Sequence, residues 1–174
     1  MKNATKQLCI NAMGLALFVV LTLCLQVPVF ENYYLCLGYI VMMVYCYNFG
    51  PISGTIVGTL GVVLYCVLTN GLRGMPGWAL GNVVIGSMVG IACKVSANCK
   101  KRFIRMLIVA AAIIVSTAIG ILCVKSFVEY ILYAEPMVLR ITKNVYAFVA
   151  DIVVMIMAVP ICEALYPTIK KILT

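Results

Sequence analysis

The chain has 174 residues, of which 65% are hydrophobic and only 10% are charged. A soluble domain carries roughly a quarter charged residues, and a chain this apolar could not cover its core with polar groups, so a soluble protein is excluded. The net charge of +8 does not favour a nucleic-acid partner, because the basic residues flank apolar runs as in membrane proteins. We predict an integral membrane protein, a single domain over residues 1–174 with the lipid bilayer around it.

Apolar runs of about 20 residues cross the hydrocarbon core as helices. Six runs follow one another along the chain, over 8–27, 34–49, 52–69, 77–94, 104–128 and 143–166. The second run is short and rich in tyrosine. The predicted fold is therefore all-α, a compact bundle of six transmembrane helices.

Lysine and arginine in short loops indicate the cytoplasmic side of a membrane protein. Nine of the 13 basic residues fall in the N-terminal flank, the loop near 94–105 and the C-terminal tail: Lys2, Lys6, Lys94, Lys100, Lys101, Arg102, Arg105, Lys170 and Lys171. We therefore expect both termini to be cytoplasmic, with the other end of the bundle facing the outside of a bacterial plasma membrane.

Small residues spaced four apart recur in the first, third and fourth runs. Such pairs lie on one helix face and let another backbone approach closely. For the glycines this predicts packing within the bundle: Gly54 and Gly58, Gly77 and Gly81, Gly86 and Gly90. Ala12 and Ala16 lie in the cytoplasmic half of the first run, where the groove could accept a helix of the bundle or one of a partner protein.

The stretch "TNGLRGMPGWALGN" (69–82) joins the third and fourth runs. Pro76 fits the first turn of a helix, and Trp78 and Asn82 follow one turn apart on one face. Trp78 is either an interfacial anchor or, with Asn82, one wall of an outer polar cup whose lid is the loop with Asn70 and Arg73. The outer loops also supply four tyrosines that suit stacking on a flat ring: Tyr33, Tyr34, Tyr130 and Tyr133.

The last run carries a carboxylate in an apolar helix. Such a group costs about 2.5–3.5 kcal/mol on insertion scales and is kept where it is partnered or useful. Asn144, Phe148 and Asp151 share one helix face, and Lys143 lies about two turns from Asp151. Asp151 therefore either locks this helix to a neighbour through an ion pair or hydrogen bond, or contacts a ligand in an outward-facing cavity.

No motif of the sequence predicts an enzyme. The chain has no histidine and no HExxH, GxSxG or P-loop pattern. Its nine cysteines form no CxxC pair, so we expect no metal site and no permanently bound cofactor, and we read the cysteines as packing residues.

Four stretches, in this order over nearly the whole chain, resemble the substrate-binding membrane component (S component) of energy-coupling factor (ECF) vitamin transporters, most closely the riboflavin type. They are "AMGLA" (12–16), "NFGPISGTIVGTLG" (48–61), "GMPGWALGNVVIG" (74–86) and "ILYAEPMVLRITKNVYAFVAD" (131–151). The sequence departs from such relatives in having one tryptophan, Trp78, at the start of the fourth run, and in having Asp151 where an amide is common.

The resemblance implies six helices with cytoplasmic termini and a vitamin-sized ligand held near the outer surface. It also implies that the alanine motif at Ala12 and Ala16 docks onto a shared transmembrane coupling protein, which joins two ATPase subunits that use the ATP. On this hypothesis the chain captures a vitamin-like micronutrient, riboflavin being the default. The alternative is a membrane scaffold or assembly protein that transports nothing. The expected substrate-binding residues are Tyr34, Asn70, Arg73, Trp78, Asn82, Glu135, Lys143, Asn144, Phe148 and Asp151.

Overall fold

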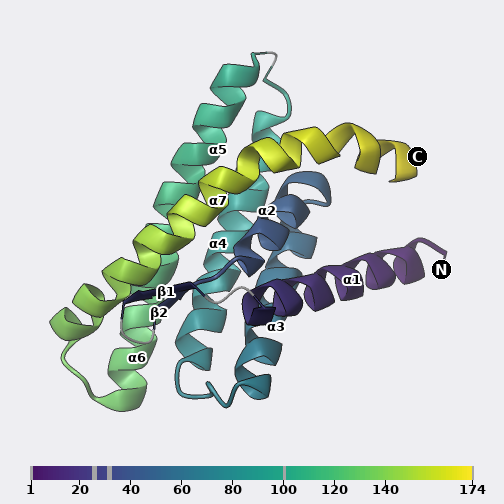
Figure 1. The fold of residues 1–174 in the computed structure, drawn as a ribbon. Helices are drawn as coiled ribbons and strands as arrows, with labels where there is room; N and C mark the ends of the chain where they lie inside the picture. Colours follow the sequence, from purple (N-terminus) through teal and green to yellow (C-terminus); the bar gives the residue numbers. More distant parts are fainter. Residues whose placement is uncertain (1, 25–26, 31–32, 100, 174) are drawn as a thin grey trace.

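The computed structural model describes residues 2–24, 27–30, 33–99 and 101–173 of the chain (Figure 1). Within them, long helices pack side by side, and one short hairpin lies against α7. The elements are α1 (Lys2–Cys24), β1 (Val27–Phe30), β2 (Tyr33–Leu35), α2 (Gly38–Asn48), α3 (Pro51–Leu68), α4 (Met75–Ser96), α5 (Arg102–Thr117), η1 (Ala118–Lys125), α6 (Ser126–Tyr133) and α7 (Met137–Leu173).

The predicted class, an all-α membrane protein, is confirmed. Five helical segments are long and apolar enough to cross a membrane: Ala4–Cys24, Pro51–Leu68, Met75–Ser96, Arg102–Tyr133 and Met137–Lys171. In lipid a backbone must satisfy its own hydrogen bonds, which a helix does within one segment. Five of the six apolar runs therefore appear as helices of spanning length, although the last two begin earlier or end later than the runs themselves.

The run over 34–49 needs correction, because it does not form a helix of spanning length. Its start belongs to β2, and α2 has 11 residues, which at 1.5 Å per residue is about half of the ~30 Å hydrocarbon core. Helix α2 packs against α1, α3, α4 and α7, and Tyr39, Met42 and Met43 are completely buried. The segment is apolar because it lies inside the protein, so the count of six spanning helices is not confirmed.

Helices α5 and α6 form one continuous helix through η1, a π-helical segment. The glycines of α4 make close contact with it. A Cβ atom on Gly81 would lie 2.8 Å from the carbonyl oxygen of Gly120, and one on Gly77 would lie 3.1 Å from that of Lys125. The prediction that these glycines serve packing within the bundle is confirmed, and the packing brings the end of η1 beside the start of α4.

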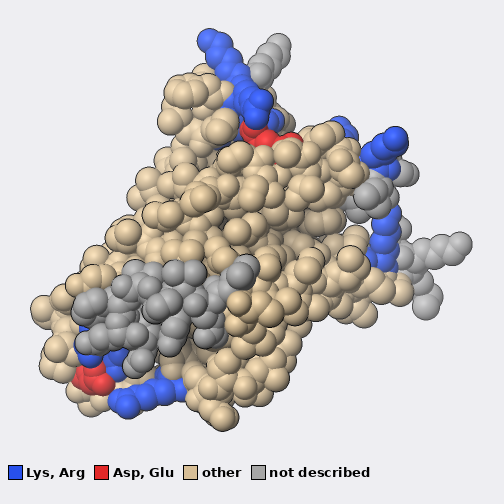
Figure 2. Space-filling view, viewed as in Figure 1, with Lys and Arg blue, Asp and Glu red and all other residues tan. Residues whose placement is uncertain are grey.

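Charged side chains gather at two ends of the molecule, with a broad uncharged surface between them (Figure 2). At one end Arg102 and Arg105 contact Glu163 at 2.5 and 2.8 Å. At the other, Arg73 and Arg140 contact Glu135 at 3.3 and 2.6 Å. This distribution suits a multi-pass membrane protein with a polar group of residues at each membrane surface. Which end is cytoplasmic stays a prediction, although the start of α1 and the end of α7 lie on the same side of the view in Figure 1.

Candidate ligand-binding site

A cavity of about 850 Å³ opens near the loops that join α3 to α4 and α6 to α7. This volume lies within the range of about 300–1,000 Å³ usual for small-molecule sites. The lining comes from almost every part of the chain: Thr22, Leu35, Cys36, Tyr65, Cys66, Thr69, Asn70, Gly71, Arg73, Gly74, Trp78, Lys125, Glu129, Tyr133, Glu135, Arg140, Lys143, Ala147 and Asp151.

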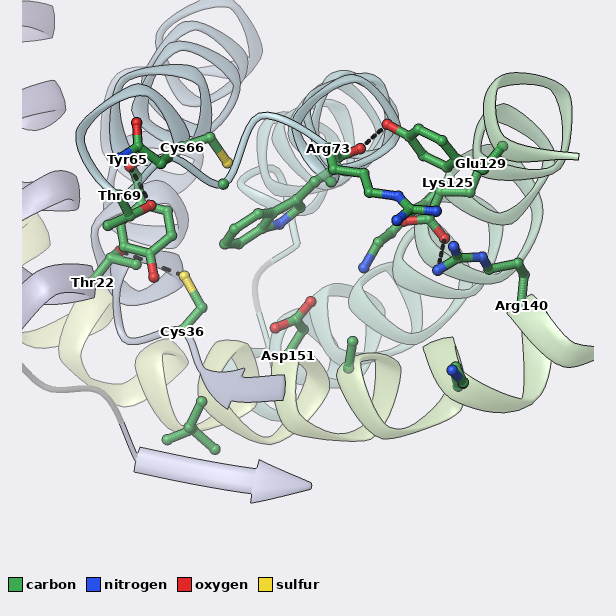
Figure 3. Close-up of a pocket in the computed structure, with 18 of the residues that line it drawn as sticks. Thr22, Cys36, Tyr65, Cys66, Thr69, Arg73, Lys125, Glu129, Arg140 and Asp151 are labelled. Atoms are coloured by element: carbon green, nitrogen blue, oxygen red, sulfur yellow. Dashed lines mark hydrogen bonds and ion pairs between the residues drawn. The ribbon is translucent and has the colours of Figure 1, made fainter. Parts of the chain in front are cut away.

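The cavity has an uncharged side and a charged side. Figure 3 shows Thr22, Cys36, Tyr65, Cys66 and Thr69 on one side, and the four labelled residues Arg73, Lys125, Glu129 and Arg140 on the other. Asp151 rises from α7 into the space between them. On the uncharged side, the rings of Tyr65 and Trp78 pack edge to face with centroids 5.8 Å apart, an arrangement that favours a flat aromatic ligand.

The charged side is held together by a chain of ion pairs. Arg140 contacts Glu135 at 2.6 Å and Glu129 at 3.8 Å, and Arg73 contacts Glu135 from the α3–α4 loop at 3.3 Å. The guanidinium of Arg73 lies 4.8 Å from the ring centroid of Tyr133, whose hydroxyl donates to the Arg73 carbonyl oxygen. We call these residues the clasp (Arg73, Glu129, Tyr133, Glu135 and Arg140), because they join two loops that lie far apart in the sequence.

A chain of hydrogen bonds holds the indole of Trp78 in place. Its indole Nε1 donates to the hydroxyl of Tyr39 at 2.9 Å, and that hydroxyl donates to Oδ1 of Asn82 at 2.7 Å. Nδ2 of Asn82 then donates to the carbonyl oxygen of Gly58 at 2.9 Å. Tyr39 and Asn82 are completely buried, so the orientation of Trp78 is tied to the packing of α2, α3 and α4.

Lys125 and Asp151 place opposite charges deep in the cavity. Their residues are 9% and 4% exposed, and the two charges attract one another. Lys143, the possible partner about two turns from Asp151 in the sequence, lines the same cavity, but Lys125 of η1 is the lysine whose charge acts on Asp151. Asp151 therefore lines a cavity and also lies near an opposite charge within the protein, so both alternatives predicted for it stay open.

Six of the ten expected substrate-binding residues line the cavity: Asn70, Arg73, Trp78, Glu135, Lys143 and Asp151. Asn82, Asn144 and Phe148 do not. Asn82 lies behind Trp78, Asn144 donates from Nδ2 to Ser126 and Glu129 at 3.0 and 3.1 Å, and Phe148 packs against the core. The side chain of Tyr34 lies outside the described residues.

Three charged lining residues, Lys125, Glu129 and Arg140, were not among the expected site residues. Lys125 and Glu129 stand one helical turn apart at the end of the run 104–128, and an ionisable residue within a spanning segment is by itself a reason to expect a site. On α7 the face that reaches the cavity holds Arg140, Ala147 and Asp151, a spacing compatible with a single helix face.

Ala12 and Ala16 are both exposed on α1. Leu8, Met13 and Leu17 are also more than half exposed on this helix. Of the two occupants predicted for the groove, a helix of the bundle is therefore excluded among the described residues. The outer side of α1 is left available to lipid or to a partner protein.

No group of three or more metal-binding side chains occurs in the described part of the chain, and its cysteines are all free thiols.

A protein-family model described as "ECF-type riboflavin transporter, S component" matches residues 2–167. No curated protein and no solved structure matches the chain.

Proposed function

The chain belongs to the family of S components of ECF-type riboflavin transporters, and from this we propose that it captures a vitamin-like micronutrient at the outer face of the bacterial plasma membrane, with riboflavin as the first candidate. Membership in this family makes the chain a substrate-binding subunit of an ECF transporter. The identity of the substrate and the details of the partners are the content of the proposal.

The observation that carries the proposal is the cavity. It combines an aromatic wall with several charged groups in a volume of about 850 Å³. A flat ring can pack against Trp78 and Tyr65 on the uncharged side, and a polar tail can lie beside the paired charges of the other side without replacing their ion pairs. A scaffold protein has no need for such a space, because buried charges are costly unless they are partnered or used.

The exposed face of α1 supports the second part of the proposal. Ala12 and Ala16 leave a shallow strip between larger apolar side chains, and small residues of this kind allow close helix contact within a membrane. We assign this strip to the transmembrane coupling protein, whose two ATPase subunits supply the energy of transport.

The test is ligand binding by the purified protein in lipid nanodiscs, measured by thermal shift and calorimetry. The panel contains riboflavin, flavin mononucleotide, thiamine, its hydroxymethylpyrimidine precursor and pyridoxine. A ligand at 100 times its Kd should stabilise the fold by about 2.7 kcal/mol. Trp78→Ala should weaken that binding, whereas Leu80→Ala, on the exposed side of α4, should not. If no member of the panel binds, the scaffold alternative is favoured.

A further inference from the structure

A group of basic residues surrounds the start of α5, at the opposite end of the continuous α5–η1–α6 helix from the cavity. No acidic residue lies between positions 94 and 105, whereas five basic residues do: Lys94, Lys100, Lys101, Arg102 and Arg105. Lys94, Lys101 and Arg102 are exposed. In Figure 2 basic side chains extend beyond this end of the molecule, with acidic atoms beneath them. The start of α5 therefore has a positive excess at the surface.

Glu163 of α7 orients two of these basic residues. Its carboxylate is 5% exposed, and each of its oxygens has a partner. Nε of Arg102 contacts Oε2 at 2.5 Å, and Nη2 of Arg105 contacts Oε1 at 2.8 Å. The guanidinium of Arg105 also lies 5.9 Å from the ring centroid of Tyr47 on α2. Arg105 thus helps to position Glu163, and Glu163 in turn orients Arg102.

Arg102 has donors left over after this contact. Its side chain is 72% exposed, and within the described residues the bond from Nε to Glu163 is its one hydrogen bond. A guanidinium has five N–H donors, so the four on Nη1 and Nη2 remain for another partner. Two parallel N–H groups match two oxygens of a phosphate. Arg102 is therefore a phosphate-binding group whose orientation is set before a ligand binds.

The surface next to Arg102 is apolar and suits lipid. The helical segment Arg102–Tyr133 has 32 residues, about 48 Å at 1.5 Å per residue, so its ends reach the headgroups on both sides of a hydrocarbon core of about 30 Å. Phe103 and Leu107 lie on one face of α5 and are 72% and 54% exposed. A soluble anion would leave this face uncovered, whereas a phospholipid would place its phosphate at Arg102 and its acyl chains along Phe103 and Leu107.

We propose that the start of α5 binds the headgroup of an anionic phospholipid, whose phosphate accepts hydrogen bonds from Arg102. Lys94 and Lys101 add positive charge that favours a headgroup of net negative charge over a zwitterionic one. The inference goes beyond the proposed function and does not depend on the ligand of the cavity. It assigns a lipid contact to the end of the protein where Glu163 joins α7 to α5.

The test measures lipid binding to the purified protein in a neutral detergent by native mass spectrometry. The protein is titrated with phosphatidylglycerol and with phosphatidylcholine of the same acyl chains, and the Kd of the first bound lipid is determined for each. Arg102→Gln removes the proposed phosphate contact. Lys171→Gln, an exposed position near the end of α7 and apart from the start of α5 (Figure 1), removes the same charge elsewhere and is the matched control.

The wild type should bind phosphatidylglycerol at least about tenfold more tightly than phosphatidylcholine, since each basic residue near the headgroup contributes about fivefold. Arg102→Gln should weaken the binding of phosphatidylglycerol by roughly 10- to 100-fold, the range for hydrogen bonds to charged groups. Lys171→Gln should weaken it by no more than about fivefold. An equal loss in both variants would overturn the inference, because a general positive charge would then explain the binding.

Two further results would also overturn the inference. Equal Kd values for the two lipids in the wild type would show that the charge of the headgroup does not matter. Displacement of phosphatidylglycerol by an equal concentration of glycerol 3-phosphate would show that the site takes a soluble anion. Should Arg102→Gln fail to fold, Arg102→Lys decides the question. Its ammonium cannot donate two parallel hydrogen bonds, so phosphatidylglycerol should still bind at least about threefold more weakly, and wild-type affinity would contradict the inference.

Discussion

Replacing Tyr39 by phenylalanine removes one oxygen atom from the bonds that hold Trp78 and leaves the ring in place. Trp78 loses the acceptor of its indole N–H, and Asn82 loses a donor at 2.7 Å. Asn82 is completely buried, so its Oδ1 has no access to water, whereas Trp78 lines the cavity and can turn its N–H towards water there. The loss in free energy of unfolding should therefore come mainly from the unpaired Oδ1 of Asn82.

The magnitude follows from these two losses. A buried acceptor without a partner costs about 1–3 kcal/mol, and a lost hydrogen bond costs about 0.5–1.5 kcal/mol net. We expect Tyr39→Phe to lower the free energy of unfolding by roughly 2–4 kcal/mol. We also expect it to lower the affinity for the ligand about tenfold, because the indole of Trp78 is no longer held in one orientation. Unfolding in mixed detergent micelles followed by circular dichroism measures the first quantity, and calorimetry measures the second.

The control is the same substitution at Tyr130, which is 46% exposed and should change the free energy of unfolding by less than about 0.5 kcal/mol. A double variant, Tyr39→Phe with Asn82→Leu, should show a coupling energy of about 1–2 kcal/mol between the two positions. If Tyr39→Phe matches the wild type in both stability and affinity, the bonds from Trp78 to Asn82 do not position the cavity wall, and the reasoning fails.

Three other variants test separate parts of the molecule. Glu163→Gln should lower the free energy of unfolding by roughly 1–2 kcal/mol, because two arginines of α5 lose a carboxylate that is 5% exposed; equal denaturation midpoints would contradict this. Ala134→Gly should raise the melting temperature, gaining about 0.5–1 kcal/mol, since φ is 51° there. Changing Ala12 and Ala16 together to leucine should abolish vitamin uptake by cells and leave ligand binding intact; a matching loss of binding would show that these alanines support the fold instead.

The membrane class and the long helices could be predicted because lipid imposes one strong rule. A backbone that crosses the bilayer must make all its hydrogen bonds within the protein, and a long apolar helix does so. The same rule misleads at 34–49. Residues buried in protein are as apolar as residues that face lipid, and Tyr39, Met42 and Met43 are completely buried. The length of such an apolar run does not predict the length of the helix in it, because the run can be buried by neighbouring helices on every side. Here the helix has only 11 residues.

Prediction from the sequence selected Arg73, Trp78 and Asp151, which interrupt apolar runs, and all three line the cavity. It could not distinguish residues that face the cavity from residues that support them. Asn82 and Asn144 are on the expected helices, yet both turn their amides to neighbouring helices. That direction depends on how helices pack, which one sequence does not determine.

The end of the helix over 104–128 was harder to interpret for a different reason. Lys125 is the last residue of η1 and Glu129 follows one turn later in α6. A π-helical segment changes the direction in which later side chains point. No residue pattern in "AIGILCVK" predicts that this segment is π-helical. Gly120 packs back to back with Gly81, so the close contact with α4 occurs within the π-helical segment that leads to Lys125.

The two sides of the cavity therefore have different tasks. In the clasp, Glu135 is already bound by two arginines and Glu129 by Arg140 and Asn144, so a ligand gains little by replacing these bonds. The clasp joins the two loops at the cavity and determines its shape. Trp78 and Asp151 are different. The indole of Trp78 is held by Tyr39 and still lines the cavity, and Asp151 lines the cavity between its two sides. Selectivity among ligands should thus depend more on the ring face of Trp78 and on Asp151 than on the clasp, since breaking an existing ion pair offsets the gain from a new contact.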